Sequence, residues 1–313
     1  MIEILVGTRN SNKRIAKGKS LLDSIDDYTI IDIETTGLDP NFNEIIELSA
    51  IKVRNNKIVE EYSTLVKPEE NLDEFIKELT GITDEMLKDK PTIENALNDY
   101  LNFIGDDIII GHNVNFDINF LYDNSIKYYN KPIENDFIDT LRMSRKYLSL
   151  ENNKLVNVAK ALNVDISGAH RALNDCYIVY GVYNILKEKI KNYVSEKDNK
   201  IKEKNIRDFE TKNDSNIILN PLFQKQCVVT GTLEKMSRDE CHAIISKLGG
   251  IISNTVNKKT NFLILGNNDY NPILRGKKSN KQIKAEQAML KGQDIQIISE
   301  NVFYDIIDDY IKI

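Results

Sequence analysis

The feature that most constrains the fold is a break in the apolar pattern between about residues 191 and 220. The first part of this segment reads KNYVSEKDNKIKEKNIRDFETKNDSN, which is charged and rich in Asn. Such segments separate domains because few apolar contacts cross them, and 313 residues are enough for two domains. We therefore predict an extension at 1–27, a first domain at 28–190, a linker at 191–220 and a second domain at 221–313.

The first domain begins as a hairpin of strands and continues with strands that alternate with helices. Strand patterns cover 28–34 and two runs between 43 and 66, which are broken at Asn55-Asn56. Helical spacing and one short apolar strand follow, with helices at 71–83, 92–105, 115–129 and 171–190 and the strand at 106–111. This order predicts an α/β fold in which helices flank a mixed sheet. In the extension, residues 14–25 have a weak helical pattern and no assigned function.

The second domain has a complete α/β pattern of its own, in the order β-α-β-β-α-β-α. Strands are predicted at 226–233, 251–256, 260–266 and 295–299, and helices at 237–250, 280–290 and 300–311. Ser237 is a typical helix N-cap, and Gly249-Gly250 is a typical helix stop. The linker between the two domains is predicted to be partly helical at its start.

The charge and cysteine content bound the class of protein. The net charge of −6 gives the whole chain no basic footprint for nucleic acid. The acidic excess lies in the first 190 residues, so a polyanionic substrate there needs a bound cation or a local basic patch. Three cysteines without metal-type spacing indicate reduced thiols. With no apolar run near ~20 residues and no signal-peptide pattern, we expect a soluble, cytoplasmic protein without membrane contact.

Two carboxylates interrupt the apolar strand YTIIDIETTGLDP. Asp32 and Glu34 project from the same face of this strand, because side chains alternate along it, and they lie near its C-terminal end. Ligands of open α/β sheets bind at that end. Two neighbouring acids raise each other's pKa unless a cation lies between them. Alone, the pair is more simply explained as an exposed acidic edge.

Two later segments carry further candidate groups. Asp117 follows GHNVNF in the first turn of a predicted helix, where the helix dipole also favours an acid. The Gly-His-Asn turn before it aims side chains at the end of the preceding strand. His170 and Asp175 are five residues apart, so within one helix they would point about 140° apart. Both can face one cleft if His170 lies at or before the helix start, as Gly168 upstream suggests.

These groups together indicate metal-assisted chemistry. Oxygen-rich ligand sets suit Mg²⁺ or Mn²⁺ better than zinc. Two such ions about 3.5–4 Å apart can bind the attacking and leaving oxygens of a phosphodiester. A nearby His is suited to take a proton from the attacking water. The predicted reaction is phosphodiester hydrolysis.

The segments DIETTG, HNVNFD and HRALND resemble the three motifs of the DEDDh exonuclease family, best known from the proofreading epsilon subunit of bacterial DNA polymerase III. The resemblance implies a ribonuclease-H-like fold, two divalent ions, and release of nucleoside 5′-monophosphates from 3′ ends. It implies that His170 is the general base and that four acids bind the metal ions: Asp32, Glu34, Asp117 and Asp175.

The same resemblance implies a set of substrate-binding residues. Thr35 and Leu38 would border the terminal nucleotide, with Leu38 against its base, and three residues would line the same cleft: His112, Asn113 and Phe116. Leu38 has an alternative role in the core, and His112 has an alternative role in bracing its turn.

Residues 220–313 resemble a BRCT domain, particularly that of bacterial NAD-dependent DNA ligases. The marks are TGTL, KLGG and KKTNFLILG, and Phe303 stands where many members have Trp. BRCT domains are binding modules, and some hold a phosphate with a hydroxyl, backbone N–H groups and a Lys. Thr230, Gly231 and Lys281 (or Lys284) match that set. The alternative is that Thr230 caps a turn and the lysines are solvated.

The leading hypothesis is a 3′–5′ exonuclease that acts on DNA, with single-stranded 3′ ends as its expected substrate. It would work in replication or repair, recruited by a protein or DNA ligand of the BRCT domain. The preference for DNA depends on that domain, so an RNA 3′-exonuclease is the nearest alternative. A non-catalytic BRCT scaffold or DNA-end-binding protein is a third hypothesis, and the complete acid set argues against it.

Overall fold

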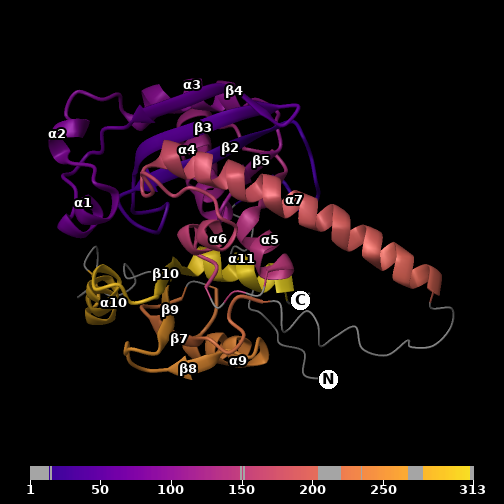
Figure 1. The fold of residues 1–313 in the computed structure, drawn as a ribbon. Coiled ribbons are helices and arrows are strands. Elements are labelled where there is room, and N and C mark those ends of the chain that lie inside the picture. The colour runs from indigo at the N-terminus through magenta and orange to yellow at the C-terminus, as the bar shows by residue number, and fades with distance from the viewer. Residues whose placement is uncertain are drawn as a thin grey trace. The chain divides into compact units, whose positions relative to one another are not determined.

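The computed structural model describes residues 14, 16–148, 150, 152–203, 220–233, 235–266 and 278–310, without the side chains of 190–203, 301, 305, 308 and 309. The chain divides into two compact units at residues 209 and 210, inside the predicted linker (Figure 1). Residues 1–13 of the predicted extension and 204–219 of the linker lie outside the described residues.

The first unit contains a six-stranded mixed sheet in the order β1-β6-β5-β2-β3-β4 (Figure 1). The strands are β1 (Ser20–Leu21), β2 (Tyr28–Thr35), β3 (Ile45–Arg54), β4 (Lys57–Leu65), β5 (Ile109–Gly111) and β6 (Phe137–Asp139). β2, β3 and β4 are antiparallel neighbours, whereas β2, β5, β6 and β1 are parallel. Asn55 and Asn56 have φ of 50° and 60° and join β3 to β4 as the predicted hairpin.

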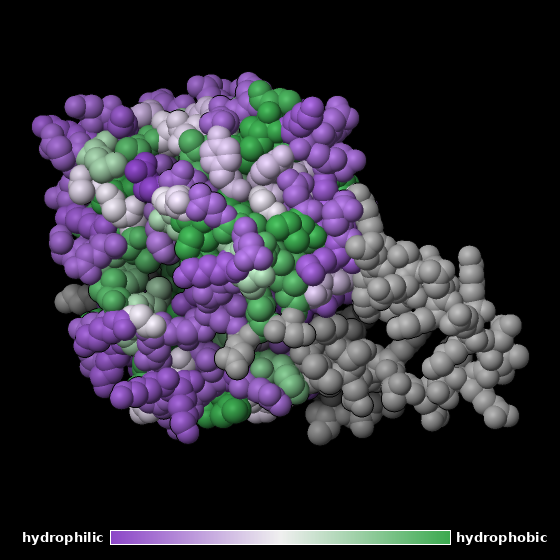
Figure 2. Space-filling model, in the orientation of Figure 1, coloured by the Kyte–Doolittle hydropathy of each residue, from purple (hydrophilic) through white to green (hydrophobic). Residues whose placement is uncertain are grey.

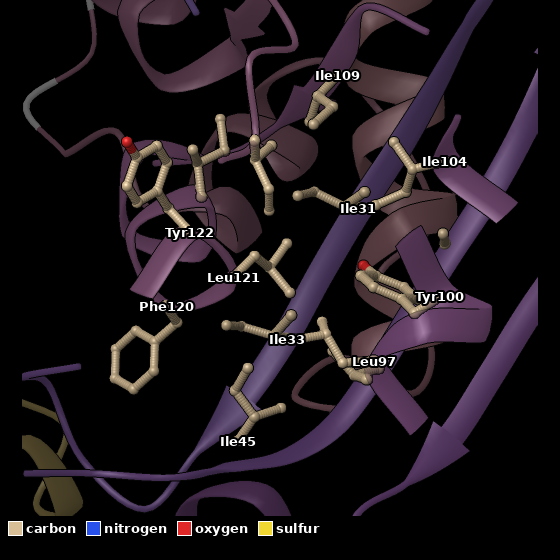
Figure 3. Close-up of a cluster of buried hydrophobic side chains, with 14 of the residues drawn as sticks. Ile31, Ile33, Ile45, Leu97, Tyr100, Ile104, Ile109, Phe120, Leu121 and Tyr122 are labelled. Atoms are coloured by element: carbon tan, nitrogen blue, oxygen red, sulfur yellow. The ribbon is translucent and has the colours of Figure 1, made fainter. Parts of the chain in front are cut away.

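Helices cover both faces of this sheet. They are α1 (Glu74–Thr80), α2 (Asp84–Leu87), α3 (Ile93–Ile104), α4 (Asn115–Tyr129), α5 (Thr140–Tyr147), α6 (Leu155–Ala161) and α7 (Ala172–Glu203). Ile31 and Ile33 of β2 share a buried cluster with α3 and α4 (Figure 3). Tyr28 and Ile30, which point to the opposite face, share another with α5, α6 and α7. The predicted mixed sheet with flanking helices is therefore confirmed.

The helical pattern at residues 14–25 is a wrong prediction. Ser20–Leu21 form an edge strand beside β6, and the Phe137 N–H donates to the Lys19 carbonyl at 2.9 Å. Arg14 forms two hydrogen bonds to the Asp123 carboxylate of α4, at 2.9 and 2.7 Å. These partners lie more than 100 residues away, so the local sequence pattern does not contain them.

The second unit is a four-stranded parallel sheet in the order β10-β9-β7-β8. Its strands are β7 (Gln226–Thr230), β8 (Ile251–Ser253), β9 (Thr260–Leu265) and β10 (Gln296–Ser299), and its helices are α9 (Arg238–Lys247), α10 (Asn280–Leu290) and α11 (Glu300–Tyr310). Ser237 is the N-cap of α9, as the sequence predicts, and it forms a capping box with Glu240. Phe303, at the position of the missing Trp, is fully buried.

Hydrophilic residues cover most of the face drawn in Figure 2, and hydrophobic residues form smaller areas between them. Within the described part of the chain, none of the helices combines the length and the apolar character that crossing a membrane requires.

Candidate active site

Three carboxylates meet at the C-terminal end of β2. Asp32 and Glu34 continue the face of β2 that carries Tyr28 and Ile30, and this face packs against α7 (Figure 1). Asp175 lies in the first turn of α7. One oxygen from each of Asp32, Glu34 and Asp175 lies within 4.8 Å of the others, and all three residues are half-buried. The structure thus joins two segments that are about 140 residues apart into one acidic cluster.

Asp117 lies in the first turn of α4 and contacts the open edge of the same strand. Its Oδ1 accepts the N–H of Ile33 at 3.0 Å. β5 pairs with β2 only at Thr29 and Ile30, so Asp117 supplies the acceptor that the strand lacks beyond that point. Its oxygens are not part of the 4.8 Å cluster, and its role as a fourth ligand stays a prediction.

The carboxylates are held in an environment that disfavours their charge. Burial raises the pKa of Asp32 well above its usual value, and the charges of Asp117 and Asp175 raise it further. Burial likewise raises the pKa of Glu34, with Asp175 as the next cause. Burial raises the pKa of Asp175 to about 6. A cluster of this kind fits hard divalent cations, which favour the ionised acids and prefer oxygen ligands.

His170 lies immediately before α7, as the spacing to Asp175 requires. Its backbone has φ of 73°, a left-handed conformation that is costly for a residue with a side chain. Its N–H donates to the two oxygens of Asp175 at 3.4 and 3.3 Å. Gly168 also has a left-handed φ of 75°, and its carbonyl accepts from the Asn174 side chain at 2.8 Å. The exposed His170 is therefore placed beside the acidic cluster by a tight turn.

The turn after β2 contains two of the predicted substrate-binding residues. The Thr35 hydroxyl is buried and donates to the Gly37 carbonyl at 2.5 Å, so it closes this turn. Leu38 is half-buried and lies on the same turn. Their contact with a nucleotide stays a prediction.

His112 has both ring nitrogens engaged within the protein. Nδ1 lies 3.0 Å from the Thr140 hydroxyl, and Nε2 lies 2.8 Å from the Asn153 carbonyl. Burial lowers the pKa of His112 to about 4. These contacts give His112 the bracing role that the sequence analysis names as its alternative.

Asn113 lies between β5 and α4, and Phe116 lies in the first turn of α4. Asn113 has φ of 66°, and its N–H donates to Asp139 at 2.8 Å. The Phe116 ring packs on Phe120 with 4.9 Å between centroids.

Asp139 also caps α5, where it accepts the Leu141 N–H at 2.8 Å. Burial raises the pKa of Asp117, and the charge of Asp139 raises it further. No sequence pattern predicts Asp139, because no helix or strand is predicted between residues 129 and 171.

Glu47 is a second residue of this region that the sequence does not predict. It is 2% exposed in β3 and pairs in register with Glu34 of β2. The Arg171 guanidinium forms two hydrogen bonds with it, at 2.8 and 3.2 Å. The available signal was a single acid inside the apolar run IIELSAI, which also fits an exposed edge.

In the second unit, the predicted phosphate-binding residues lie together at the end of β7. The Thr230 hydroxyl donates to the Ser279 hydroxyl at 3.1 Å, and Lys281 donates to the Val229 carbonyl at 3.0 Å. Gly231 follows with φ of 79°. Burial, and then the nearby Arg238, lower the pKa of Lys281. Lys284, in contrast, is exposed, so Lys281 is the lysine that lies beside this turn.

Comparison with known proteins agrees with both halves of this description. Residues 29–183 match the exonuclease family RNase_T, and residues 219–306 match the BRCA1 C-terminus (BRCT) domain. The DNA polymerase III epsilon subunit of Aquifex aeolicus is 37% identical over 182 residues, which are 58% of this chain and 89% of that protein. The PolC-type DNA polymerase III of Thermotoga maritima is 40% identical over 156 residues, which are 50% of this chain.

The two kinds of relative differ greatly in length. This chain spans 89% of the epsilon subunit but only 11% of the PolC-type polymerase. Among solved structures, Escherichia coli exonuclease I in complex with a dT13 oligonucleotide has a TM-score of 0.50 at 18% identity, over 55% of this chain and 43% of that one. This last likeness concerns the fold. By its sequence and its ribonuclease-H-like fold, the chain belongs to the family of 3′–5′ exonucleases that includes the DNA polymerase III epsilon subunit, and it carries a BRCT domain after the exonuclease domain.

Proposed function

We propose that this protein removes nucleotides from the 3′ ends of DNA by hydrolysis with two divalent metal ions, and releases nucleoside 5′-monophosphates. The observation that carries the proposal is the cluster of Asp32, Glu34 and Asp175 within 4.8 Å, beside which a tight turn places His170. The acids lie at the end of a central strand and at the start of a helix, and this strand and helix pack together in a buried hydrophobic cluster.

The side chains divide the chemistry between them. Asp32, Glu34 and Asp175 would hold Mg²⁺ or Mn²⁺, with Asp117 as the fourth acid, and the ions would stabilise charge on the phosphodiester oxygens. His170 takes the proton of the attacking water as the general base. Asp175 accepts the backbone N–H of His170 and so fixes the ring-bearing residue relative to the acids.

The preference for DNA and a role in replication or repair rest on the relatives and on the second domain. One relative is named as a subunit of DNA polymerase III and the other as a DNA polymerase III of the PolC type. A BRCT domain adds a binding site for a protein or a DNA end, and Thr230, Gly231 and Lys281 could hold a phosphate of either ligand.

The test uses 5′-labelled single-stranded DNA and RNA oligonucleotides of the same sequence, with Mg²⁺ or Mn²⁺. We expect the DNA to shorten stepwise from its 3′ end with release of mononucleotides, and Asp32→Asn to stop this. Faster shortening of RNA would favour the RNA-exonuclease alternative. Binding of Mn²⁺ without any cleavage, and with Asp32→Asn indistinguishable from the wild type, would favour a scaffold.

A further inference from the structure

Glu47 and Glu34 form a pair of like charges across two strands. They face each other in the antiparallel register of β2 and β3, where opposite side chains lie on the same face. Directly opposed like charges destabilise a sheet, and Glu47 is 2% exposed. Glu47 is also absent from the 4.8 Å acidic cluster. A buried acid beside a metal-binding acid therefore needs another explanation.

The partners of Glu47 are two consecutive residues at the start of α7. Arg171 donates from Nη2 to Oε1 at 2.8 Å and from Nε to Oε2 at 3.2 Å. The backbone N–H of Ala172 donates to Oε2 at 3.2 Å. Two parallel bonds from a guanidinium fix both the distance and the plane of the carboxylate, and an acid at a helix N-terminus is further stabilised by the helix dipole.

His170 immediately precedes these two residues. Its left-handed backbone, with φ of 73°, persists only where the surroundings impose it. The bonds from His170 to Asp175 and from Asn174 to Gly168 stay within the turn and α7. The bonds of Glu47, in contrast, join the start of α7 to β3, the strand next to β2.

We propose that the Glu47–Arg171 ion pair is a positioning device of the active site. It holds the first turn of α7 against the sheet, which sets the place of His170 and Asp175 relative to Asp32 and Glu34. It also neutralises Glu47, so that this acid does not compete with Glu34 for cations. Arg171 and Glu47 act through these neighbours and touch no reacting atom. This inference rests on the proposed exonuclease function.

The test compares Arg171→Ala and Arg171→Lys with a matched control, Arg54→Ala. Arg54 donates two hydrogen bonds to the Asp107 carboxylate, at 2.9 and 2.8 Å, from the other end of β3. Its removal breaks a similar ion pair without a change at α7.

For Arg171→Ala we expect kcat to fall about 10–100-fold, the usual effect of losing a residue that orients a metal-binding or catalytic group. KM for the oligonucleotide should stay nearly unchanged, and added guanidinium should restore part of the rate. The kcat of Arg171→Lys should lie between those of the wild type and Arg171→Ala, since Lys keeps the charge but cannot form the paired bonds. Arg54→Ala should leave kcat unchanged.

Hydrogen exchange supplies a readout without catalysis. Amides of residues 170–176 should exchange about tenfold faster in Arg171→Ala than in the wild type or Arg54→Ala. This result decides the inference even if the wild type cleaves nothing, an outcome that would refute only the proposed function. Unchanged exchange and kcat in Arg171→Ala, or a loss confined to KM, would overturn the positioning role.

Discussion

Replacement of Asp175 by Asn should stabilise the protein when divalent ions are chelated, although it removes an acid that the reaction needs. Burial raises the pKa of Asp175 to about 6 from a usual value of 3.8. At about 1.4 kcal/mol per pKa unit, ionisation of Asp175 costs the folded state roughly 3 kcal/mol. Asn carries no charge, and its side-chain oxygen still accepts the His170 N–H.

The sign of the pH dependence follows from the direction of this pKa shift. Because the folded-state pKa is raised, the folded protein binds the proton more tightly than the unfolded chain does between about pH 4 and 6. The free energy of unfolding therefore falls as the pH rises through this window. Asp175→Asn does not titrate, so its advantage over the wild type should be near zero at pH 4 and complete at pH 8.

Scanning calorimetry in EDTA at pH 4 and pH 8 would measure this difference. For a domain of this size, roughly 3 kcal/mol corresponds to a rise of about 6–12 °C in Tm of the exonuclease domain at pH 8. The transition of the BRCT unit serves as an internal reference. Asp99→Asn is the matched control, because Asp99 is an exposed acid on α3, and its Tm should not change.

Addition of Mn²⁺ should raise the Tm of the wild type more than that of Asp175→Asn, since the ion compensates the same charges. A lower Tm for Asp175→Asn at pH 8, or a shift of equal size at both pH values, would refute the reasoning. Either result would mean that hydrogen bonds to the Asp175 carboxylate stabilise its ionised form more than burial destabilises it.

Three further results are expected. His170→Ala should slow DNA cleavage about 10²–10⁴-fold if His170 is the general base. The ratio of the wild-type kcat to the variant kcat should become smaller as the pH is raised. Burial lowers the pKa of His112 to about 4, so the stability that depends on its neutral ring is present above about pH 6.5 and is lost as the pH falls toward 4. In urea unfolding, the difference in the free energy of unfolding between wild type and His112→Asn should therefore decrease by roughly 3 kcal/mol from pH 6.5 to pH 4. Lys281→Ala should weaken binding of a phosphorylated ligand to the BRCT domain about tenfold or more, measured by fluorescence anisotropy, while cleavage of a short oligonucleotide stays unchanged.

The parts of the fold that local sequence determines could be predicted. Alternation along β2 places Asp32 and Glu34 on one face, and the five-residue spacing requires His170 to precede α7; the structure has both features. The predicted helix at 115–129 has the bounds of α4. These features depend on the period of a strand or a helix, which the local sequence pattern shows directly.

The parts that depend on distant contacts could not be predicted. β1 exists because Ser20 and Leu21 bond to β6, which lies more than 100 residues away. β6, α5 and α6 are short, with 3, 8 and 7 residues, and such elements carry little periodic signal. The ion pair of Glu47 and Arg171 spans 124 residues. The local sequence around Glu47 or Arg171 contains no pattern that indicates the other residue.

The first described residues have a consequence for where the exonuclease domain can be cut. The family match begins at residue 29, but β1 covers the outer edge of β6, and Arg14 is bound to α4. A truncation at residue 28 would expose unpaired N–H and C=O groups along β6, and an open sheet edge is a template for pairing with another chain. We therefore expect β1 and the Arg14 contact to protect this edge from self-association, and a fragment that keeps both to aggregate less than one that begins at residue 28.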